Sequence, residues 1–291
     1  MQLEVLPEKP ENQVLGAAMK TRIGNRVYGN HTYIMGILNV TPDSFSDGGR
    51  YTGLDAALYH AEQMLREGAD ILDVGGESTR PGYTRISDEE EISRITPVIE
   101  AIRARLDIPV SADTYKPAVA AAALQAGADM INDIWGFQAE PGMAEVVAQA
   151  GAACCLMHNR KEPVYDSFFE DVLSDLRRSI ALAKAAGIPD DRILLDGGVG
   201  FAKSREQNLE IIRRGSEIAA LGYPVLLGTS RKSVIGLTLD VPVDQRLEGT
   251  LATTVVAVMT GCQFVRVHDV LANRRAVDMT EAILGKERQD G

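Results

Sequence analysis

Residues 109–134 read PVSADTYKPAVAAAALQAGADMINDI, and the order of patterns in this stretch decides the fold. A short apolar run ends at Asp113, and a second one begins at Met130. Between them lies an alanine-rich segment with helical periodicity that ends at Gly127, because glycine commonly follows the last turn of a helix. The stretch therefore predicts a strand, a helix and a second strand, the unit from which parallel sheets are built.

The same unit repeats on both sides of this stretch. Short apolar or β-branched runs occur at residues 33–40, 71–75, 109–113, 130–134, 153–158, 193–196, 225–228 and 264–268. Segments with a 3.6-residue period separate these runs, and several of the segments also end in glycine. Eight strands, each followed by a helix, predict an α/β fold, the closed (β/α)8 TIM barrel. A doubly wound open sheet is the alternative, but the turn after the first strand reads NVTPDSFSDGG and lacks a dinucleotide-binding fingerprint.

The N-terminal segment differs from the rest of the chain. Residues 1–31 are polar and contain only short apolar stretches, so we expect an N-terminal arm or a short hairpin. Residues 32–291 are expected to form the barrel as a single domain, because no linker, low-complexity tract or longer repeat interrupts them.

The composition is acidic, with 30 Lys and Arg against 41 Asp and Glu and a formal net charge of −11 in 291 residues. Such a surface repels phosphate backbones, so we expect no nucleic-acid partner. No apolar window is long enough to span a membrane, and residues 1–20 lack the apolar core of a secretory signal. Three cysteines, two of them adjacent, form no disulfide framework and are typical of reduced thiols in the cytoplasm.

Polar or ionisable side chains lie at the end of every predicted strand or in the loop after it. They are Asn39, Asp73, Arg80, Asp113, Asn132, Asp133, His158, Asn159, Asp196, Lys232, Arg266 and His268. In TIM barrels the chemistry takes place at the C-terminal ends of the strands. One such residue alone is a common helix cap, whereas all of them together are better explained by a shared pocket. Its mixture of carboxylates and cations suits a ligand with a donor-rich edge and an anionic part.

Three of these residues form a set that recognises a ring edge. A carboxylate can accept two parallel N–H bonds from a 2-aminopyrimidinone edge, as it does from a guanidinium group, and an Asn beside it serves mixed positions. Asp113, Asn132 and Asp196 are therefore predicted to bind a pterin-like or guanine-like ring. Two structural interpretations stay open: Asp113 as the cap of the next helix, and Asp196, which precedes GGVGF, as part of a tight turn.

The cationic candidates follow the last two predicted strands. Lys232 and Ser233 lie in GTSRKS, which opens a helix; a helix N-terminus with Lys and Ser binds anions readily, with an ordinary solvated lysine as the alternative. Arg266 and His268 alternate on a strand and so face the same side. A buried arginine needs an anionic or planar partner, which favours a functional Arg266. For His268, capping or core packing stays the alternative.

Several motifs resemble those of the dihydropteroate synthase family. GILNVTPDSFSDGG at 36–49 and DVGGESTRPG at 73–82 are similar to its two signatures. The match continues in order with DTYK at 113–116, NDIWG at 132–136, LMHN at 156–159, GTSRKS at 228–233 and RVHDV at 266–270. The resemblance implies a cytoplasmic TIM-barrel transferase, a homodimer, that joins 6-hydroxymethyl-7,8-dihydropterin diphosphate to 4-aminobenzoate in folate synthesis. Sulfonamides mimic 4-aminobenzoate, so the resemblance also implies a sulfonamide target.

The resemblance further implies roles for individual residues. Pterin binding falls to Asp113, Asn132, Met157, Asp196, Phe201, Gly228, Lys232 and Arg266. Diphosphate binding falls to Asn39, Arg80, Arg266 and His268, with Mg²⁺ as the cofactor near Asn39. Aminobenzoate binding falls to Thr79, Arg80, Pro81, Lys232 and Ser233. The expected catalytic residues are Asn39, Asp43, Asp47, Lys232, Arg266 and His268, where Asp43 and Asp47 support the incoming amine or the metal.

An aromatic amine is a poor nucleophile, so we expect the leaving diphosphate to drive the reaction through an early C–O break and a carbocation-like methylene group.

Two alternative functions would use a similar barrel. A methyltransferase that binds methyltetrahydrofolate would keep Asp113, Asn132 and Asp196, but it would not need TPDSFSDGG or SRKS. A catalytically silent paralogue would bind the pterin and lack the second substrate site.

The sequence departs from the family pattern at a few positions and leaves the dimer face open. Ala112 stands where a larger aliphatic is usual, Gly197 where proline is common, and Ala202 where glycine is common. These departures concern the shape of the pocket. The last helices are expected to form the dimer interface, with LATTVVAVMTG at 251–261 as one apolar face; packing of that face against the barrel is the alternative.

Overall fold

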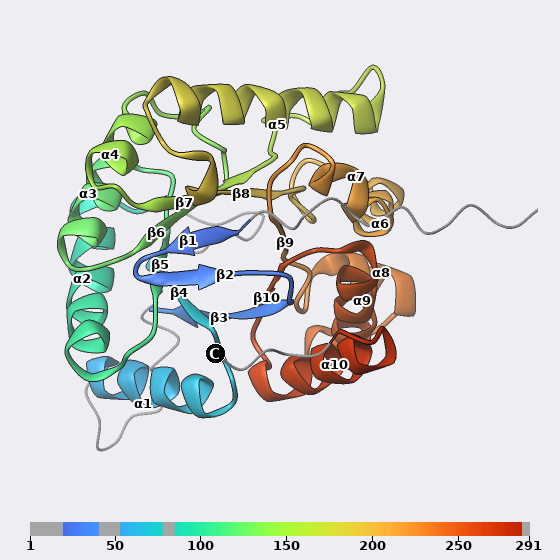
Figure 1. Cartoon of the computed structure of the whole chain (residues 1–291), viewed down its shortest axis with the longest axis horizontal. Coiled ribbons are helices and arrows are strands. Elements are labelled where there is room, and N and C mark those ends of the chain that lie inside the picture. The colour runs from blue at the N-terminus through green and yellow to red at the C-terminus, as the bar shows by residue number, and fades with distance from the viewer. Residues whose placement is uncertain (1–19, 41–52, 78–84, 287–291) are drawn as a thin grey trace, which may run out of the picture.

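Parallel strands close into a barrel in the computed structural model of the chain, which describes residues 20–40, 53–77 and 85–286 (Figure 1). The strands are β3 (Tyr33–Asn39), β4 (Ile71–Gly75), β5 (Val110–Asp113), β6 (Met130–Asp133), β7 (Ala153–Met157), β8 (Ile193–Asp196), β9 (Val225–Leu227) and β10 (Phe264–Val267). Each pairs with its neighbour in sequence, and β10 pairs with β3 to close the ring. The predicted TIM barrel is confirmed, with every strand end within one residue of its prediction.

Helices cover the outside of the barrel (Figure 1). They are α1 (Gly53–Arg66), α2 (Asp88–Arg105), α3 (Pro117–Gln125), α4 (Met143–Gln149), α5 (Phe168–Ala185), α6 (Arg205–Arg213), α7 (Gly215–Ala219), α8 (Ser233–Leu239), α9 (Leu247–Thr260) and α10 (Val270–Ile283), with the 3-10 turns η2 (Asp190–Arg192) and η3 (Val243–Gln245). Gly127, at φ 109°, stops the chain from continuing α3, because the left-handed conformation favours glycine. Within the described residues, no helix is long and apolar enough to cross a lipid bilayer.

The strands are apolar on both faces because each face packs against a separate layer. Ile71 belongs to the cluster inside the barrel, whereas Leu72 belongs to the cluster between the strands and the helices. Cys155 and Cys154 divide between the same two layers. All of Cys154, Cys155 and Cys262 are buried and unpaired, as expected for core thiols. This two-sided burial explains why the strands read as continuous apolar runs in the sequence.

A hairpin fills one end of the barrel. It consists of β1 (Thr21–Ile23) and the antiparallel β2 (Arg26–Tyr28). Ile23 and Tyr28 are buried and pack with Met35, Met130 and Phe264 inside the barrel, where the rings of Tyr28 and Phe264 lie 5.4 Å apart. The short hairpin expected before the barrel is therefore present, while residues 1–19 lie outside the described part. Phe264 begins β10, so the hairpin and the apolar residues packed on it form a plug at the end of the barrel opposite the strand C-termini.

The register of the strands aligns polar residues at that other end. Asp113 at the end of β5 is level with Asn132 on β6. In the same way, Met157 at the end of β7 is level with Asp196 at the end of β8. Because the strands are parallel, these side chains gather around one mouth of the barrel.

Candidate active site

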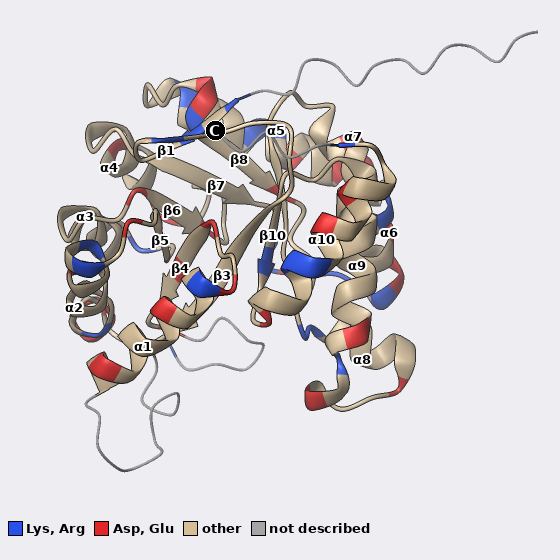
Figure 2. Cartoon of the chain, turned by 60° about the horizontal axis from the view of Figure 1, so that its bottom comes forward, with Lys and Arg blue, Asp and Glu red and all other residues tan. Residues whose placement is uncertain are grey.

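Arg266 on β10 reaches two buried aspartates, which lie on the adjacent strands β4 and β5. Its Nε donates to Asp73 Oδ2 at 2.6 Å, and its Nη2 donates to Asp113 Oδ2 at 2.6 Å. The side chain of Asp73, on β4, is fully buried, and that of Arg266 is 18% exposed. The blue segment of β10 in Figure 2 marks this cation. Two charge-assisted contacts fix the plane of the guanidinium group, which meets the expectation that a buried Arg266 has an anionic partner.

Each of these two carboxylates keeps one buried oxygen without a hydrogen-bond partner. The Oδ1 atoms of Asp73 and Asp113 accept no hydrogen bond from any described residue. Asn132 donates from Nδ2 to Asp73 Oδ2 at 3.2 Å, so its amide faces the same centre. Burial raises the pKa of Asp113 to about 7, against the opposing effect of Arg266. A buried unpaired oxygen costs about 1–3 kcal/mol, so these atoms mark acceptors for the N–H groups of a ligand.

Asp196 and Lys232 form a second charged group on the far side of the mouth. Asp196 Oδ1 accepts the Gly198 backbone N–H at 2.7 Å. The Lys232 ammonium donates to the Val199 carbonyl and lies 5.0 Å from the centre of the Phe201 ring. Burial raises the pKa of Asp196 and lowers the pKa of Lys232 to about 8. The ammonium therefore faces the loop after β8 rather than the solvent at the start of α8.

Gly228, directly after β9, lies between the two charged groups. A methyl group built on its Cα would lie 3.7 Å from Asp196 Oδ2 and 3.8 Å from both Lys232 Nζ and Arg266 Cβ. All these groups therefore border a single site. The missing side chain lets a ligand approach the backbone at this point.

An apolar wall adjoins the polar groups. The side chains that form it are Tyr115, Ile134 and Met157, with Trp135 and Phe201 packed against them. Met157 is level with Asp196 in the sheet, and Phe201 contacts Lys232. A flat heteroaromatic ring with N–H donors on one edge fits such a wall beside carboxylates.

Asn39 and His268 form the more exposed edge. Asn39 ends β3, and a methyl group built on Gly75 would lie 3.8 Å from Asn39 Oδ1 and 3.7 Å from Asp113 Oδ2. The Ser230 hydroxyl oxygen accepts the backbone N–H of His268 at 3.1 Å and lies 3.0 Å from its Nδ1. These contacts orient the imidazole after β10. A polar, partly exposed edge of this kind suits the anionic part of a ligand.

The structure brings most of the predicted site residues to the mouth of the barrel. They are Asn39, Asp113, Asn132, Met157, Asp196, Phe201, Gly228, Lys232, Arg266 and His268. Ser233 is exposed at the first position of α8. Asp43, Asp47, Thr79, Arg80 and Pro81 lie outside the described residues, so their roles stay predictions.

The structure distinguishes capping and turn roles from ligand binding for three of the aspartates at the strand ends. α3 begins at Pro117 after Lys116, so Asp113 does not cap it. Asp196 does stabilise the turn after β8, but only through its Oδ1. Asp133, by contrast, accepts the backbone N–H groups of Trp135 and Phe137 through its two oxygens, both at 2.8 Å. Asp133 is therefore a turn residue rather than a ligand-binding one.

Sequence reasoning placed Asp73 at a strand end without giving it a role, yet it is the residue that joins Arg266 to Asn132. The signal was present, because a carboxylate inside an otherwise apolar strand is costly without a partner. The identity of the partner was not readable, since Arg266 lies 193 positions away.

The described residues at this mouth do not form a metal site by themselves. Among residues 20–40, 53–77 and 85–286 there is no cluster of three or more His, Cys, Asp or Glu side chains that could hold a metal ion. Asn39 offers a single hard amide oxygen. Mg²⁺ often keeps several waters and takes one or two protein oxygens together with phosphate oxygens. These residues therefore fit an Mg²⁺ ion that binds together with a phosphate group.

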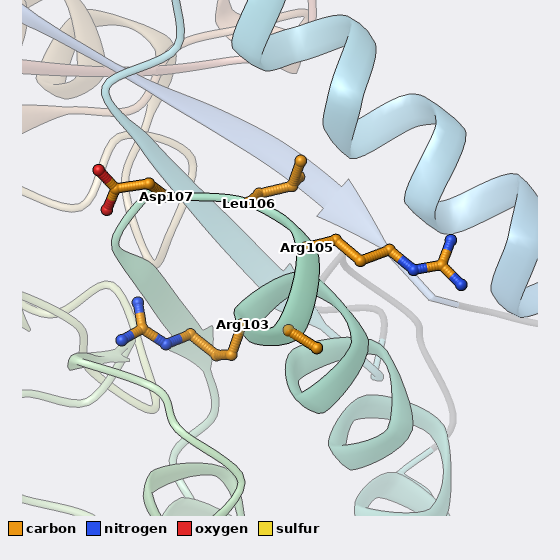
Figure 3. Close-up of a pocket in the computed structure, with 5 residues that line it drawn as sticks. Arg103, Arg105, Leu106 and Asp107 are labelled. Atoms are coloured by element: carbon orange, nitrogen blue, oxygen red, sulfur yellow. The ribbon is translucent and has the colours of Figure 1, made fainter.

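A separate surface hollow of about 330 Å³ contributes no group to this site (Figure 3). Its lining residues are Arg103, Ala104, Arg105, Leu106 and Asp107, at the end of α2 and the turn before β5. In Figure 3 the side chains of Arg103 and Arg105 extend in opposite directions. The turn leads into the start of β5, whereas Asp113 ends that strand.

Comparisons with known proteins agree with this geometry. The family described as "Pterin binding enzyme" matches residues 35–268. The dihydropteroate synthase of Clostridium beijerinckii is 56% identical over 90% of this chain and 99% of its own. The crystal structure of dihydropteroate synthase from Clostridium difficile with pteroic acid has a TM-score of 0.85 at 52% identity, covering 88% of this chain and 98% of that one. The structure of Yersinia pestis dihydropteroate synthase with a sulfonamide drug has a TM-score of 0.86 at 42% identity, covering 92% and 100%. The chain therefore belongs to the pterin-binding enzyme family and, within it, to the dihydropteroate synthases.

Proposed function

We propose that the protein condenses 6-hydroxymethyl-7,8-dihydropterin diphosphate with 4-aminobenzoate, giving 7,8-dihydropteroate and diphosphate in folate biosynthesis. The observation that carries this proposal is the unpaired, buried Oδ1 of Asp113, whose other oxygen is held by Arg266. A ligand that offers an N–H donor satisfies such an oxygen, and the pyrimidinone edge of a pterin offers one. The identity to dihydropteroate synthases over nearly the whole chain supports the same reaction.

In this proposal the pterin ring lies between the two charged groups. Asp113 and Asp196 accept N–H groups of its edge, and Asn132 serves a mixed donor and acceptor position. The remaining contacts fall to Met157, Phe201, Gly228, Lys232 and Arg266. The guanidinium plane that Asp73 and Asp113 hold in place stacks on the ring face, while the Lys232 ammonium donates to the ring carbonyl.

The diphosphate binds at the more exposed edge, with Asn39, His268 and Arg266 as described contacts and Arg80 as a further one. Asn39 would hold the Mg²⁺ ion, which supplies charge neutralisation to the leaving diphosphate when bound. The Asn39 amide oxygen and the Asp113 carboxylate both lie next to Gly75, so the residue that would hold the ion borders the same side of the site as Asp113.

The reaction exchanges one bond for another at the methylene carbon. The C–O bond breaks and its electron pair leaves with the diphosphate, whose charge Arg266 and His268 stabilise. Asp113 and Asp196 stabilise the positive charge that develops on the ring and its methylene group. The lone pair of the 4-aminobenzoate amine then forms the C–N bond, and the amine proton passes to solvent. No strong general base is needed, because the attacking aromatic amine is neutral.

The 4-aminobenzoate site adjoins the start of α8. Ser233 is exposed there, beside Lys232, and it completes a site with Thr79, Arg80 and Pro81. Asp43 and Asp47 support the incoming amine or the metal. Lys232 takes part in both substrate sites, since its ammonium faces the loop after β8 while its backbone precedes Ser233.

A homodimer in the cytoplasm is the state that we infer for the protein. One face of α9 packs on the barrel through Thr254, Ala257 and neighbouring residues, while Met259 is 64% exposed. On α10, Met279 and Ile283 are also exposed, so the two helices together offer an apolar surface for a second copy. Light scattering after size exclusion tests this: Met279→Glu should yield a monomer, and a monomeric wild type would contradict the dimer.

Inhibition by a sulfonamide tests the proposed reaction. A sulfonamide should raise the apparent KM for 4-aminobenzoate and leave kcat unchanged, with diphosphate release as the readout. Diphosphate release that does not depend on 4-aminobenzoate would contradict the condensation. Methyl transfer from methyltetrahydrofolate, assayed in parallel, would identify the methyltransferase alternative.

A further inference from the structure

The side chain of Lys203, in the loop between β8 and α6, uses all of its hydrogen-bonding capacity. Its Nζ lies 2.9 Å from His158 Nδ1 and donates to the carbonyl oxygens of Gly198 at 2.9 Å and Phe201 at 3.0 Å. An ammonium group has three N–H donors, which match these three acceptors, while the His158 carbonyl oxygen lies farther away at 3.5 Å. No carboxylate of a described residue lies within ion-pair distance of Lys203, so this cation is held by neutral acceptors.

His158 has one fixed tautomer in this network. Its Nε2 lies 3.2 Å from Asp175 Oδ2, which also accepts Arg160 Nε at 2.7 Å. A carboxylate paired with arginine only accepts, so His158 Nε2 carries the proton and Nδ1 accepts from Lys203. Burial, with Lys203 adding to the effect, lowers the pKa of His158 to about 3, which keeps this imidazole neutral. Burial likewise lowers the pKa of Lys203 to about 7.

The acceptors of Lys203 belong to the two strand ends that carry the pterin site. His158 follows Met157, and its backbone N–H donates to the Asp196 carbonyl at 2.8 Å, which ties β7 to β8. Gly198 has a φ of 71°, and a Cβ on it would lie 1.9 Å from the His158 carbonyl oxygen, so only glycine fits this approach. The Gly198 N–H is also the donor to Asp196 Oδ1.

A buried cation that no carboxylate of the described residues contacts is a costly way to stabilise a loop, because only neutral acceptors and the more distant charges of Asp196 and Asp175 offset its desolvation. An apolar side chain could fill the same space at lower cost. The ammonium instead fixes the relative position of two loops. It binds Phe201 and Gly198 in the loop after β8 and His158 in the loop after β7, so Phe201 of the apolar wall keeps a fixed position relative to the Asp196 carboxylate.

We propose that Lys203 is a positioning residue for the pterin site, which holds the loop after β8 against the end of β7 so that Phe201 and Asp196 meet the ring together. This inference rests on the proposed function. Lys203 touches no reacting atom in this arrangement. It acts through the backbone of Gly198 and Phe201 and through the imidazole of His158.

Calorimetric titration with 6-hydroxymethylpterin tests the proposal in the full-length protein. Lys203→Met, which keeps the length of the side chain and removes its donors, should weaken binding by about tenfold or more, the loss expected from one charge-assisted contact. Lys203→Gln retains two donors and should fall between Met and wild type. The matched control is Lys184→Met on α5, where an exposed lysine pairs with Asp190, and this variant should bind like wild type.

Steady-state kinetics and thermal unfolding separate positioning from mere stability. The KM for the pterin diphosphate should rise in Lys203→Met, while the KM for 4-aminobenzoate stays within about twofold of wild type, a factor worth less than 1 kcal/mol. If both Lys203 variants are folded and bind the pterin as tightly as wild type, with only a lower Tm, the proposal is wrong. If the wild type does not bind 6-hydroxymethylpterin at all, the proposed function fails and takes this inference with it.

Discussion

At the scale of single residues, the account depends on charges that lack enough partners in the free protein. Arg266 is shared by Asp73 and Asp113, so each carboxylate has one satisfied and one unsatisfied oxygen. Such a site is destabilising in isolation and becomes favourable when a ligand supplies N–H donors. The burial that leaves these oxygens unpaired also raises the pKa of Asp113. The affinity for the pterin therefore depends on pH through this one carboxyl group.

The pH dependence of pterin binding follows from this link. Burial of Asp113 favours its protonated form, so its contribution to stability is present below the unfolded pKa and is lost as the pH rises to the folded pKa of about 7. Protonation of the unpaired Oδ1 of Asp113 would replace an acceptor for a ring N–H group by a donor, so the ionised form binds the ring better. Affinity for 6-hydroxymethylpterin should therefore be full above about pH 7 and fall by about tenfold per pH unit below it.

Asp113→Asn provides the control for this pH dependence. The variant should bind the pterin about tenfold to a hundredfold more weakly and should lose the pH dependence near neutrality. Asp190→Asn, an exposed carboxylate that pairs with Lys184, should retain both the affinity and the pH profile. An Asp113→Asn profile identical to that of wild type would assign the titration to another group.

Gly228→Ala tests the shape of the site. The added methyl group makes ordinary contacts of 3.7–3.8 Å with Asp196, Lys232 and Arg266, so the free protein should keep its Tm. The same methyl group occupies the space where the ring is proposed to lie, so pterin affinity should fall by about tenfold. Gly29→Ala, where a Cβ meets nothing within 4 Å, should change neither quantity. Undiminished affinity in Gly228→Ala would place the ring elsewhere.

At the level of secondary-structure elements, the loop after β8 carries Phe201 of the apolar wall and also contains a strained backbone conformation at Ala202. Ala202 has a φ of 46°, and its carbonyl accepts the Tyr165 hydroxyl at 2.9 Å. The left-handed conformation is costly for a residue with a Cβ, which explains why glycine is the better fit here. The departure from glycine at this position therefore lowers stability without removing any polar group of the site.

Ala202→Gly should raise the free energy of unfolding by about 1 kcal/mol, because glycine removes the steric conflict at a positive φ. Ala121→Gly, at an exposed position inside α3, should lower it by a similar amount, about 1 kcal/mol, since glycine is a poor helix former. Chemical denaturation measures both. A loss of stability in Ala202→Gly would show that the loop relaxes the strain by other means.

The hairpin is the other element with a distinct energetic role. Ile23 is fully buried in the barrel interior, so Ile23→Ala should cost about 2–5 kcal/mol of stability. Replacement of Val27, on the exposed side of β2, by Ala should lower the free energy of unfolding by less than about 0.5 kcal/mol. The active site lies at the other end of the strands, so kcat/KM of the folded Ile23→Ala protein should equal that of wild type. A selective loss of activity would show that the plug also shapes the site.

At the scale of the whole molecule, the barrel separates an apolar end from a charged one. The sequence predicts this well, because each strand is a short apolar run and polar residues lie at its end or in the loop after it. Asp113, Asn132 and Asp196 could be found in this way, since their position depends only on register. The partners of Arg266 and Lys203 could not, because side-chain reach determines them and they lie far away in the sequence: Asp73 lies 193 positions from Arg266, and His158 lies 45 positions from Lys203.

Formation of 7,8-dihydropteroate, detected by mass, distinguishes a synthase from a protein that only binds pterins. The purified protein is mixed with the pterin diphosphate, 4-aminobenzoate and Mg²⁺, with and without a chelator. We expect product in the presence of Mg²⁺, and a large loss in Asp196→Asn, which removes the carboxylate that most strongly favours the charged form of Lys232. Clear pterin binding with no product would contradict the account and identify the protein as a silent pterin-binding member of the family.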